Sequence, residues 1–132
     1  MMTTQDSADS VVTFPEGLPG FEASRRFLLI TSPDFAPFTC VHGADPGAPS
    51  FLAIDPRRAE SAYRCELPAA DRARLKAAEN TTLLWLALVA PREDGPTVNL
   101  RAPLVINPDT MLGLQVVAAE SEYPLAAKLR EM

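Results

Sequence analysis

The sequence predicts a mainly β fold, a small antiparallel β-barrel-like domain that carries one short helix. Short stretches of alternating apolar and polar residues are separated by turns rich in Pro, Gly, Asn and Asp, which is typical of an antiparallel barrel or sandwich. A chain of 132 residues with 47% apolar residues can bury one core and leaves no room for a second domain. We therefore predict a disordered N-terminus over residues 1–10 and a single barrel domain over residues 11–132.

The first half of the chain is predicted to form four strands, at residues 10–13, 26–31, 38–42 and 51–54. Between the first two strands, Pro19 and Gly20 occupy the central positions of a type II turn, so the chain reverses there. In the third strand, alternation places Cys40 and His42 on one face. The loop over residues 43–50 contains two Gly and two Pro, which suits a hairpin connection to the fourth strand.

One helix is predicted over about residues 68–80. Pro68 suits its first turn, Asp71 favours the positive end of the helix dipole, and Asn80 can take the left-handed position at the C-terminal end. Leu75 is the only large apolar residue of this segment. The helix is therefore expected to cover the surface or mouth of the barrel and not to form its core.

The second half of the chain is again predicted to be strands. Residues 81–89 are apolar on both faces, which favours a central strand covered on both sides and a core position for Trp85. Residues 97–108 divide into TVNLRAP and LVINP, two short strands that each end at a proline. A last strand is expected at residues 114–119, and the weakly alternating residues 62–67 are a further candidate.

The charge and the termini limit the functions that this chain can have. Seventeen acidic against twelve basic residues give a net charge of −5, which disfavours direct binding to nucleic acid. Residues 1–10 contain neither a basic patch nor an apolar run, so no signal peptide is expected and the predicted location is the cytoplasm. The longest apolar run, residues 83–90, is far shorter than the roughly 20 residues of a membrane helix.

The sequence contains no recognisable motif for catalysis or for a cofactor. Cys40 and Cys65 lack a metal-binding spacing and His42 is the single histidine, so no metal site and no cofactor are expected. A hydrolase built on this histidine and a cysteine is a weak alternative. Glu120 and Glu122 could share a strand face, but a solvated rim is the more common role of such a pair.

The asparagines of residues 97–108 are the polar residues of greatest interest. Asn99 and Asn107 lie on either side of the corner at Pro103, where their side chains can satisfy backbone groups that the prolines leave open. A corner with unpaired backbone is also a place where another chain can bind. We therefore select the following candidate partner-binding residues: Asn99, Leu100, Arg101, Pro103, Ile106 and Asn107.

Several motifs in a fixed order connect the chain with a known family. They are FPEGLPGFE, RFLLI, PF, FLAIDP, a Leu-rich strand, TVNLRAPLVINP, GLQVV and YP. Over about residues 12–123 the chain resembles the flagellar assembly factor FliW family, and GLPGFE combined with NLRAPLVIN at this separation is specific. The resemblance implies a β-barrel-like domain without catalysis. It also implies binding to the translational repressor CsrA, which relieves repression of flagellin mRNA, and competing binding to flagellin.

The chain departs from that family at two places. Members usually have an additional strand before the FPEGLPGFE segment, whereas only ten residues precede Val11 here, so the resemblance implies an open barrel edge. The family usually has Trp and Gln where this chain has Cys40 and His42. A barrel that binds a small molecule is the main alternative function, although the Phe and Leu residues are numerous enough to fill a barrel of this size.

Overall fold

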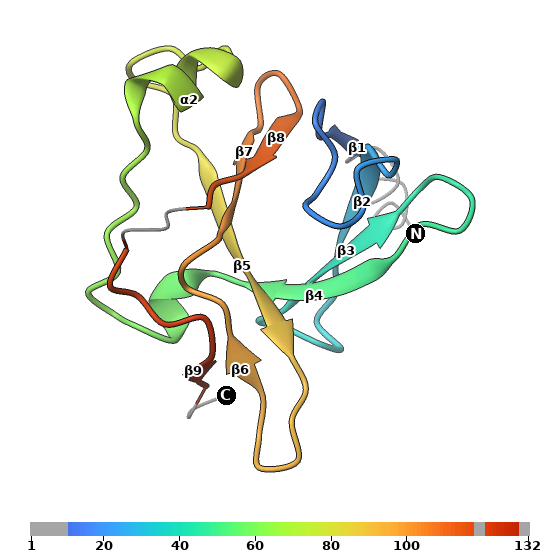
Figure 1. Cartoon of the computed structure of the whole chain (residues 1–132), viewed down its shortest axis with the longest axis vertical. Coiled ribbons are helices and arrows are strands. Elements are labelled where there is room, and N and C mark those ends of the chain that lie inside the picture. Colours follow the sequence, from blue (N-terminus) through green and yellow to red (C-terminus); the bar gives the residue numbers. More distant parts are fainter. Residues whose placement is uncertain (1–10, 118–120, 130–132) are drawn as a thin grey trace.

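The computed structural model describes residues 11–117 and 121–129, which form nine strands, one 3-10 turn and one α-helix (Figure 1). In chain order these elements are β1 (Val11–Thr13), β2 (Arg26–Thr31), β3 (Thr39–Gly43), β4 (Ser50–Ile54), η1 (Pro56–Arg58), α2 (Ala69–Arg74), β5 (Leu84–Ala90), β6 (Thr97–Val98), β7 (Leu104–Asn107), β8 (Leu112–Gln115) and β9 (Ala127–Lys128). The fold is mainly β with one short helix, as the sequence predicts. The predicted disorder of residues 1–10 lies outside the described residues.

Seven strands close into a ring. Their order is β4-β3-β2-β1-β8-β7-β5, and pairing between β4 and β5 completes it. β6 and β9 extend the sheet from β5 outside the ring. The pairs are antiparallel except β1 with β8, which is parallel and, among the described residues, consists of Thr13 opposite Leu112 alone. The predicted antiparallel barrel is therefore confirmed, with one short parallel closure.

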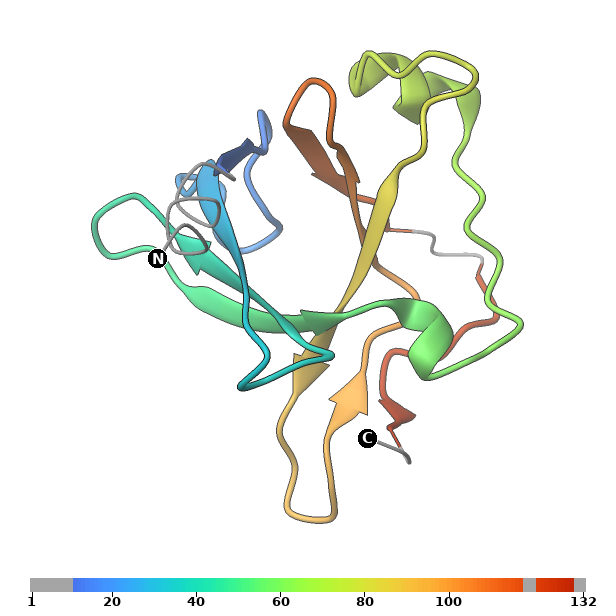
Figure 2. The same cartoon turned by 180° about the vertical axis from the view of Figure 1, so that it is seen from behind.

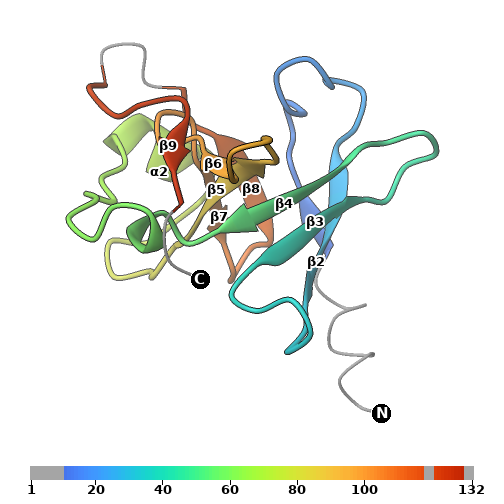
Figure 3. The ribbon, with the colours of Figure 1, turned by 90° about the horizontal axis from the view of Figure 1, so that it is seen from below.

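Two clusters of buried apolar side chains lie on the two faces of this ring. The inner cluster receives side chains from every strand of the ring except β8, and consists of Val12, Phe14, Leu18, Phe27, Val41, Ala53, Leu86, Leu104 and Ile106. The outer cluster covers the outer face of β5, β7 and β8, and consists of Ile54, Tyr63, Leu75, Trp85, Ala87, Val98, Leu100, Val105, Leu114 and Leu129. Figures 2 and 3 show the segment from η1 through α2 and the C-terminal strand β9 on this same side.

Strand β5 separates the two clusters. Trp85 and Ala87 belong to the outer cluster, whereas Leu86 belongs to the inner cluster and Leu88 packs against it. Because side chains of a strand alternate between its faces, a strand that contacts apolar clusters on both sides must be apolar throughout. The predicted central strand and the core position of Trp85 are confirmed.

The inside of the ring is filled by side chains. Phe14 and Phe27 are fully buried and pack edge to face, with their ring centroids 5.6 Å apart. Phe27 also lies beside Phe51, at a centroid distance of 6.4 Å. Aromatic side chains that bury this much area leave little space for a ligand, so the packing does not favour the alternative of a small-molecule-binding barrel.

The helix is shorter than the predicted segment over residues 68–80. It ends after Arg74, because Lys76 takes a left-handed conformation (φ 56°) and donates its backbone N–H to the Ala73 carbonyl. The following N–H, that of Ala77, donates to the Arg72 carbonyl, which completes a Schellman motif. The helix itself buries no residue, as expected, but Leu75 at its C-cap is fully buried in the outer cluster.

Three strand predictions need correction. Residues 62–67 form no strand, because Tyr63 is held in a coil by aromatic packing in the outer cluster. Only Thr97–Val98 of the TVNLRAP segment pairs as a strand, since the chain turns at Asn99. The last predicted strand, residues 114–119, is replaced by Leu112–Gln115, and residues 118 and 119 lie outside the described residues. Strand β9 was not predicted.

Candidate functional site

The corner between β6 and β7, residues 99–103, is built around the side chain of Asn99. Its Oδ1 atom accepts hydrogen bonds from the backbone N–H groups of Arg101 (3.0 Å) and Ala102 (3.1 Å). The backbone N–H of Asn99 donates to the Leu88 carbonyl of β5. This confirms that the Asn99 side chain satisfies the backbone groups that the corner leaves without ladder partners.

Two tyrosines attach the corner to distant parts of the chain. The Tyr63 hydroxyl donates to the buried Leu100 carbonyl (2.9 Å), and the Arg101 Nε donates to the Tyr123 carbonyl (2.9 Å). The two tyrosine rings lie 4.5 Å apart. Burial, with smaller contributions from Cys65 and Tyr123, raises the pKa of Tyr63 from 10.0 to about 12, so the hydroxyl remains a donor at neutral pH. A hollow of about 190 Å³ beside these rings is lined in part by Leu100, Arg101 and Pro103.

Asn107 has a structural role at the other end of β7. It is 1% exposed, and its Nδ2 donates to the Leu75 carbonyl at the C-cap of α2 (2.9 Å). Its Oδ1 accepts from the Asp109 backbone N–H (2.9 Å), while the Thr110 hydroxyl also donates to Leu75. One buried amide therefore fixes both the β7–β8 turn and the end of the helix.

The six candidate partner-binding residues differ in exposure. Leu100, Pro103, Ile106 and Asn107 are buried, whereas Asn99 and Arg101 are partly exposed. The structure brings the first four candidates, Asn99, Leu100, Arg101 and Pro103, together in the corner and places Ile106 in the inner cluster. Contact with a partner stays a prediction for all six, and Arg101 has the one charged side chain among them.

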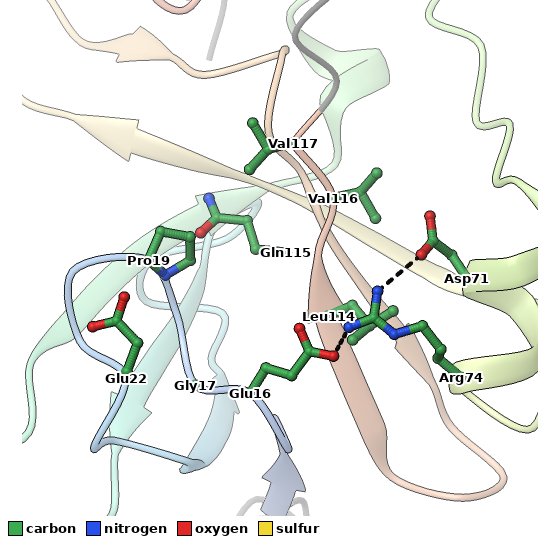
Figure 4. A pocket seen from close by; sticks show the side chains of 10 residues that line it. All are labelled: Glu16, Gly17, Pro19, Glu22, Asp71, Arg74, Leu114, Gln115, Val116 and Val117. Atoms are coloured by element: carbon green, nitrogen blue, oxygen red, sulfur yellow. Dashed lines mark hydrogen bonds and ion pairs between the residues drawn. The ribbon is translucent and has the colours of Figure 1, made fainter.

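A second feature, which the sequence did not single out as a site, is a groove between residues 16–22 and residues 114–117. It has a volume of about 380 Å³, and Figure 4 shows Glu16 and Glu22 at one wall and the end of β8 at the other. Arg74 of α2 lies at the same groove, paired with Glu16 and with Asp71 (3.2 Å). We call it the seam groove, because it lies where the ring closes between β1 and β8.

Two glycines shape the wall of the seam groove that residues 16–22 form. Gly20 (φ 88°) completes the predicted type II turn, in which the Phe21 N–H donates to the Leu18 carbonyl. Gly17 (φ 68°) packs so closely on Glu22 that a Cβ atom would lie 2.5 Å from the Glu22 carbonyl oxygen. The Gly20 N–H donates to the Glu22 carboxylate and thereby lowers the pKa of Glu22. The GLPGFE motif therefore holds an ionised carboxylate at the groove.

On the barrel side of the same seam lies an apolar hollow of about 280 Å³. Its lining includes Leu18, Phe21, Phe51 and Leu88, with Gln115 at the end of β8 and Val117 just after it. Phe21 is 44% exposed and Val117 is 61% exposed, although both are apolar. Two sequence motifs that are far apart in the chain thus meet at this hollow. They are FPEGLPGFE and NLRAPLVIN with the residues after it.

Among the described residues, the hydrogen bond of His42 is to a serine and not to a cysteine. His42 is exposed on β3, and its Nδ1 lies 2.7 Å from the Ser50 hydroxyl of β4. Cys65 packs against the outer cluster, and burial raises the pKa of its thiol, which disfavours a reactive thiolate. In the described part of the chain no group of His, Cys, Asp and Glu could hold a metal ion.

Comparison with known proteins agrees with this fold. The model of the family described as FliW protein matches residues 1–129. The chain belongs to the FliW family. Flagellar assembly factor FliW of Natranaerobius thermophilus is 38% identical over 119 residues, which cover 87% of this chain and 78% of that protein. The protein of the same name from Thermotoga maritima is 27% identical, over 95% of this chain and 86% of its own length.

A solved structure extends the match to three dimensions. The crystal structure of a flagellar assembly factor FliW superposes with a TM-score of 0.83 at 27% sequence identity, covering 92% of this chain and 86% of that one. The FliW fold is therefore shown by sequence and by structure. No helix within residues 11–117 and 121–129 has the length and apolar character needed to span a membrane.

Proposed function

We propose that this FliW family member is a non-enzymatic flagellar assembly and regulatory protein that acts in the cytoplasm by binding other proteins. Its partners in this proposal are CsrA, whose repression of flagellin mRNA it relieves, and flagellin, which competes with CsrA for it. The observation that carries the proposal is family membership, because the named relatives are flagellar assembly factors.

The charge of the chain supports a protein partner that itself binds RNA. The chain has a net charge of −5, and a protein that binds RNA must present cationic surface to the phosphates. An acidic domain is attracted to such a surface and is repelled by the RNA. This favours binding to the repressor CsrA and disfavours direct binding to the mRNA.

The chemistry of the described residues supports binding over catalysis. The buried polar side chains, such as Asn107 and Tyr63, are used in hydrogen bonds to backbone groups. The accessible features include an apolar hollow with the exposed ring of Phe21 and the partly exposed guanidinium of Arg101, and aromatic and arginine side chains are enriched at interfaces.

Titration calorimetry with purified CsrA and with flagellin tests the proposal. Binding to each partner alone, and loss of CsrA from the complex when flagellin is added, are the expected results. Absence of binding to both partners, or a stable ternary complex, would contradict it.

A matched pair of variants tests the role of the corner in the same assay. We expect Arg101→Ala to weaken binding of one partner about tenfold, as loss of an interface arginine often does. Arg92→Ala removes the same charge from the exposed β5–β6 loop and should leave both affinities unchanged. Equal effects of the two variants would mean that net charge, and not the corner, governs affinity.

A further inference from the structure

In the described part of the chain, the edge of β8 that faces β1 has almost no strand partner. The two strands meet at Thr13 and Leu112, where the Thr13 N–H donates to the Met111 carbonyl. Directly after this contact the chain turns away, because Pro15 follows Phe14 and the Gly17 N–H donates back to the Phe14 carbonyl. Within residues 11–117 and 121–129, no strand pairs with this edge of β8 after Leu112.

The backbone of β8 points polar groups into this gap. Val116 donates its N–H to the Pro103 carbonyl, on the β7 side. In an antiparallel pair successive residues direct their backbone groups to opposite edges, and the register of Gln115 opposite Leu104 continues that alternation. The N–H and carbonyl groups of Gln115 and the N–H of Val117 therefore face the seam groove.

Two different environments lie on the two sides of this exposed edge. On the outer side is the seam groove, where the carboxylates of Glu16, Glu22 and Asp71 outnumber the guanidinium of Arg74 and leave a local formal charge of −2. On the barrel side is the apolar hollow with the exposed ring of Phe21. Side chains of an added strand would alternate between these two sides.

We propose that the seam groove binds an extended peptide segment of a protein partner, which pairs with the free edge of β8 and carries alternating basic and apolar side chains. The backbone groups of Gln115 and Val117 supply the ladder hydrogen bonds, as in other cases of strand addition. The net negative charge of the groove, in which Glu22 lies outside the ion pairs of Arg74, selects basic side chains, and the apolar hollow takes the residues between them. The proposal concerns the chemistry of the segment and does not depend on CsrA or flagellin as its source.

The probe is a fluorescein-labelled peptide of about seven residues, roughly the length of a strand, in which Val and Lys alternate. A peptide in which Val and Glu alternate is the control for charge, and the Val and Lys peptide with N-methylated backbone is the control for ladder hydrogen bonds. Fluorescence anisotropy with the full chain should show binding of the first peptide and much weaker binding of both controls.

Two pairs of variants locate the binding site. Glu22→Gln keeps an acceptor for the Gly20 N–H but removes one charge, and should weaken the probe about two- to fivefold. Glu93→Gln makes the same change in the exposed β5–β6 loop and should have no effect. Val117→Pro removes one edge N–H and should weaken the probe about three- to tenfold more than Val117→Ala, which removes side-chain atoms and keeps the N–H.

Several results would overturn the proposal. One is binding of the peptide of alternating Val and Glu as tight as that of the probe, and another is probe binding that neither Glu22→Gln nor Val117→Pro weakens. A third is a dimer in sedimentation equilibrium that Val117→Pro dissociates, since a second copy of the chain would then occupy the edge. Melting curves establish that each variant is folded. If the chain binds CsrA or flagellin but not the probe, only the proposal about the seam groove is refuted. If the chain binds only the probe, the proposed partners are refuted.

Discussion

Replacing Asn99 by alanine tests whether the corner is held by one side-chain oxygen. In the structure Oδ1 accepts two backbone N–H groups, those of Arg101 and Ala102, and both bonds are only partly buried. Each amide that loses its acceptor costs about 1–3 kcal/mol when water cannot replace it. Because water reaches part of this corner, we expect a total of about 1–3 kcal/mol and not twice that amount. For a domain of this size that loss lowers the melting temperature by roughly 4–15 °C.

Chemical denaturation of Asn99→Ala and Asn99→Asp, followed by titration with a partner, is the assay. Aspartate keeps an acceptor oxygen at the same position, so it should recover most of the lost free energy of unfolding. Partner binding by the alanine variant should fall only as far as the folded fraction falls. An unchanged stability, or a loss of binding by a fully folded alanine variant, would refute the structural role and indicate direct contact.

Asn107→Ala should cost about 1–3 kcal/mol for each group left unsatisfied, and should lower amide protection at the C-terminal end of α2, which hydrogen exchange measures. The pKa of Tyr63 is raised from 10.0 to about 12, so the stability that the protonated hydroxyl contributes is present below pH 10 and is lost as pH rises toward 12. In urea denaturation, the free energy of unfolding of Tyr63→Phe should therefore fall less between pH 10 and pH 12 than that of the unsubstituted chain. The chain alone should not shift a flagellin leader RNA in a gel at about 150 mM salt, because its net charge is −5, and a shift would contradict the proposed route through a protein partner.

The features that the sequence predicted correctly depend on local rules. Strand β2 was predicted with its observed bounds because an apolar run is stopped by Ser32 and Pro33. The type II turn followed from Pro19 and Gly20, since the second central position needs positive φ. The central position of β5 followed from an unbroken apolar run. In each of these three cases, the residues within the element and next to it are sufficient for the prediction.

The features that the sequence did not predict depend on contacts between distant segments. Leu75 is buried because the helix end docks on Asn107, 32 residues later in the chain. Tyr63 is not in a strand, because its hydroxyl donates to the Leu100 carbonyl and its ring packs on the ring of Tyr123. No periodicity or spacing records such contacts, and an exposed helix with a single apolar residue gives no sign of where that residue docks.

The seam groove arises from the same residues that identify the family. Pro15 cannot donate to a ladder and Gly17 allows the chain to fold back on Glu22, so FPEGLPGFE ends the pairing of β1 after Thr13. Residues 112–117 stay extended beside β7 after the Thr13–Leu112 pair, because the Pro103 carbonyl still accepts the Val116 N–H. One strand therefore turns away while its neighbour remains extended, and the backbone of β8 is exposed between an acidic and an apolar wall. The motif that follows the single Thr13–Leu112 pair is thus the cause of the open edge in the described part of the chain.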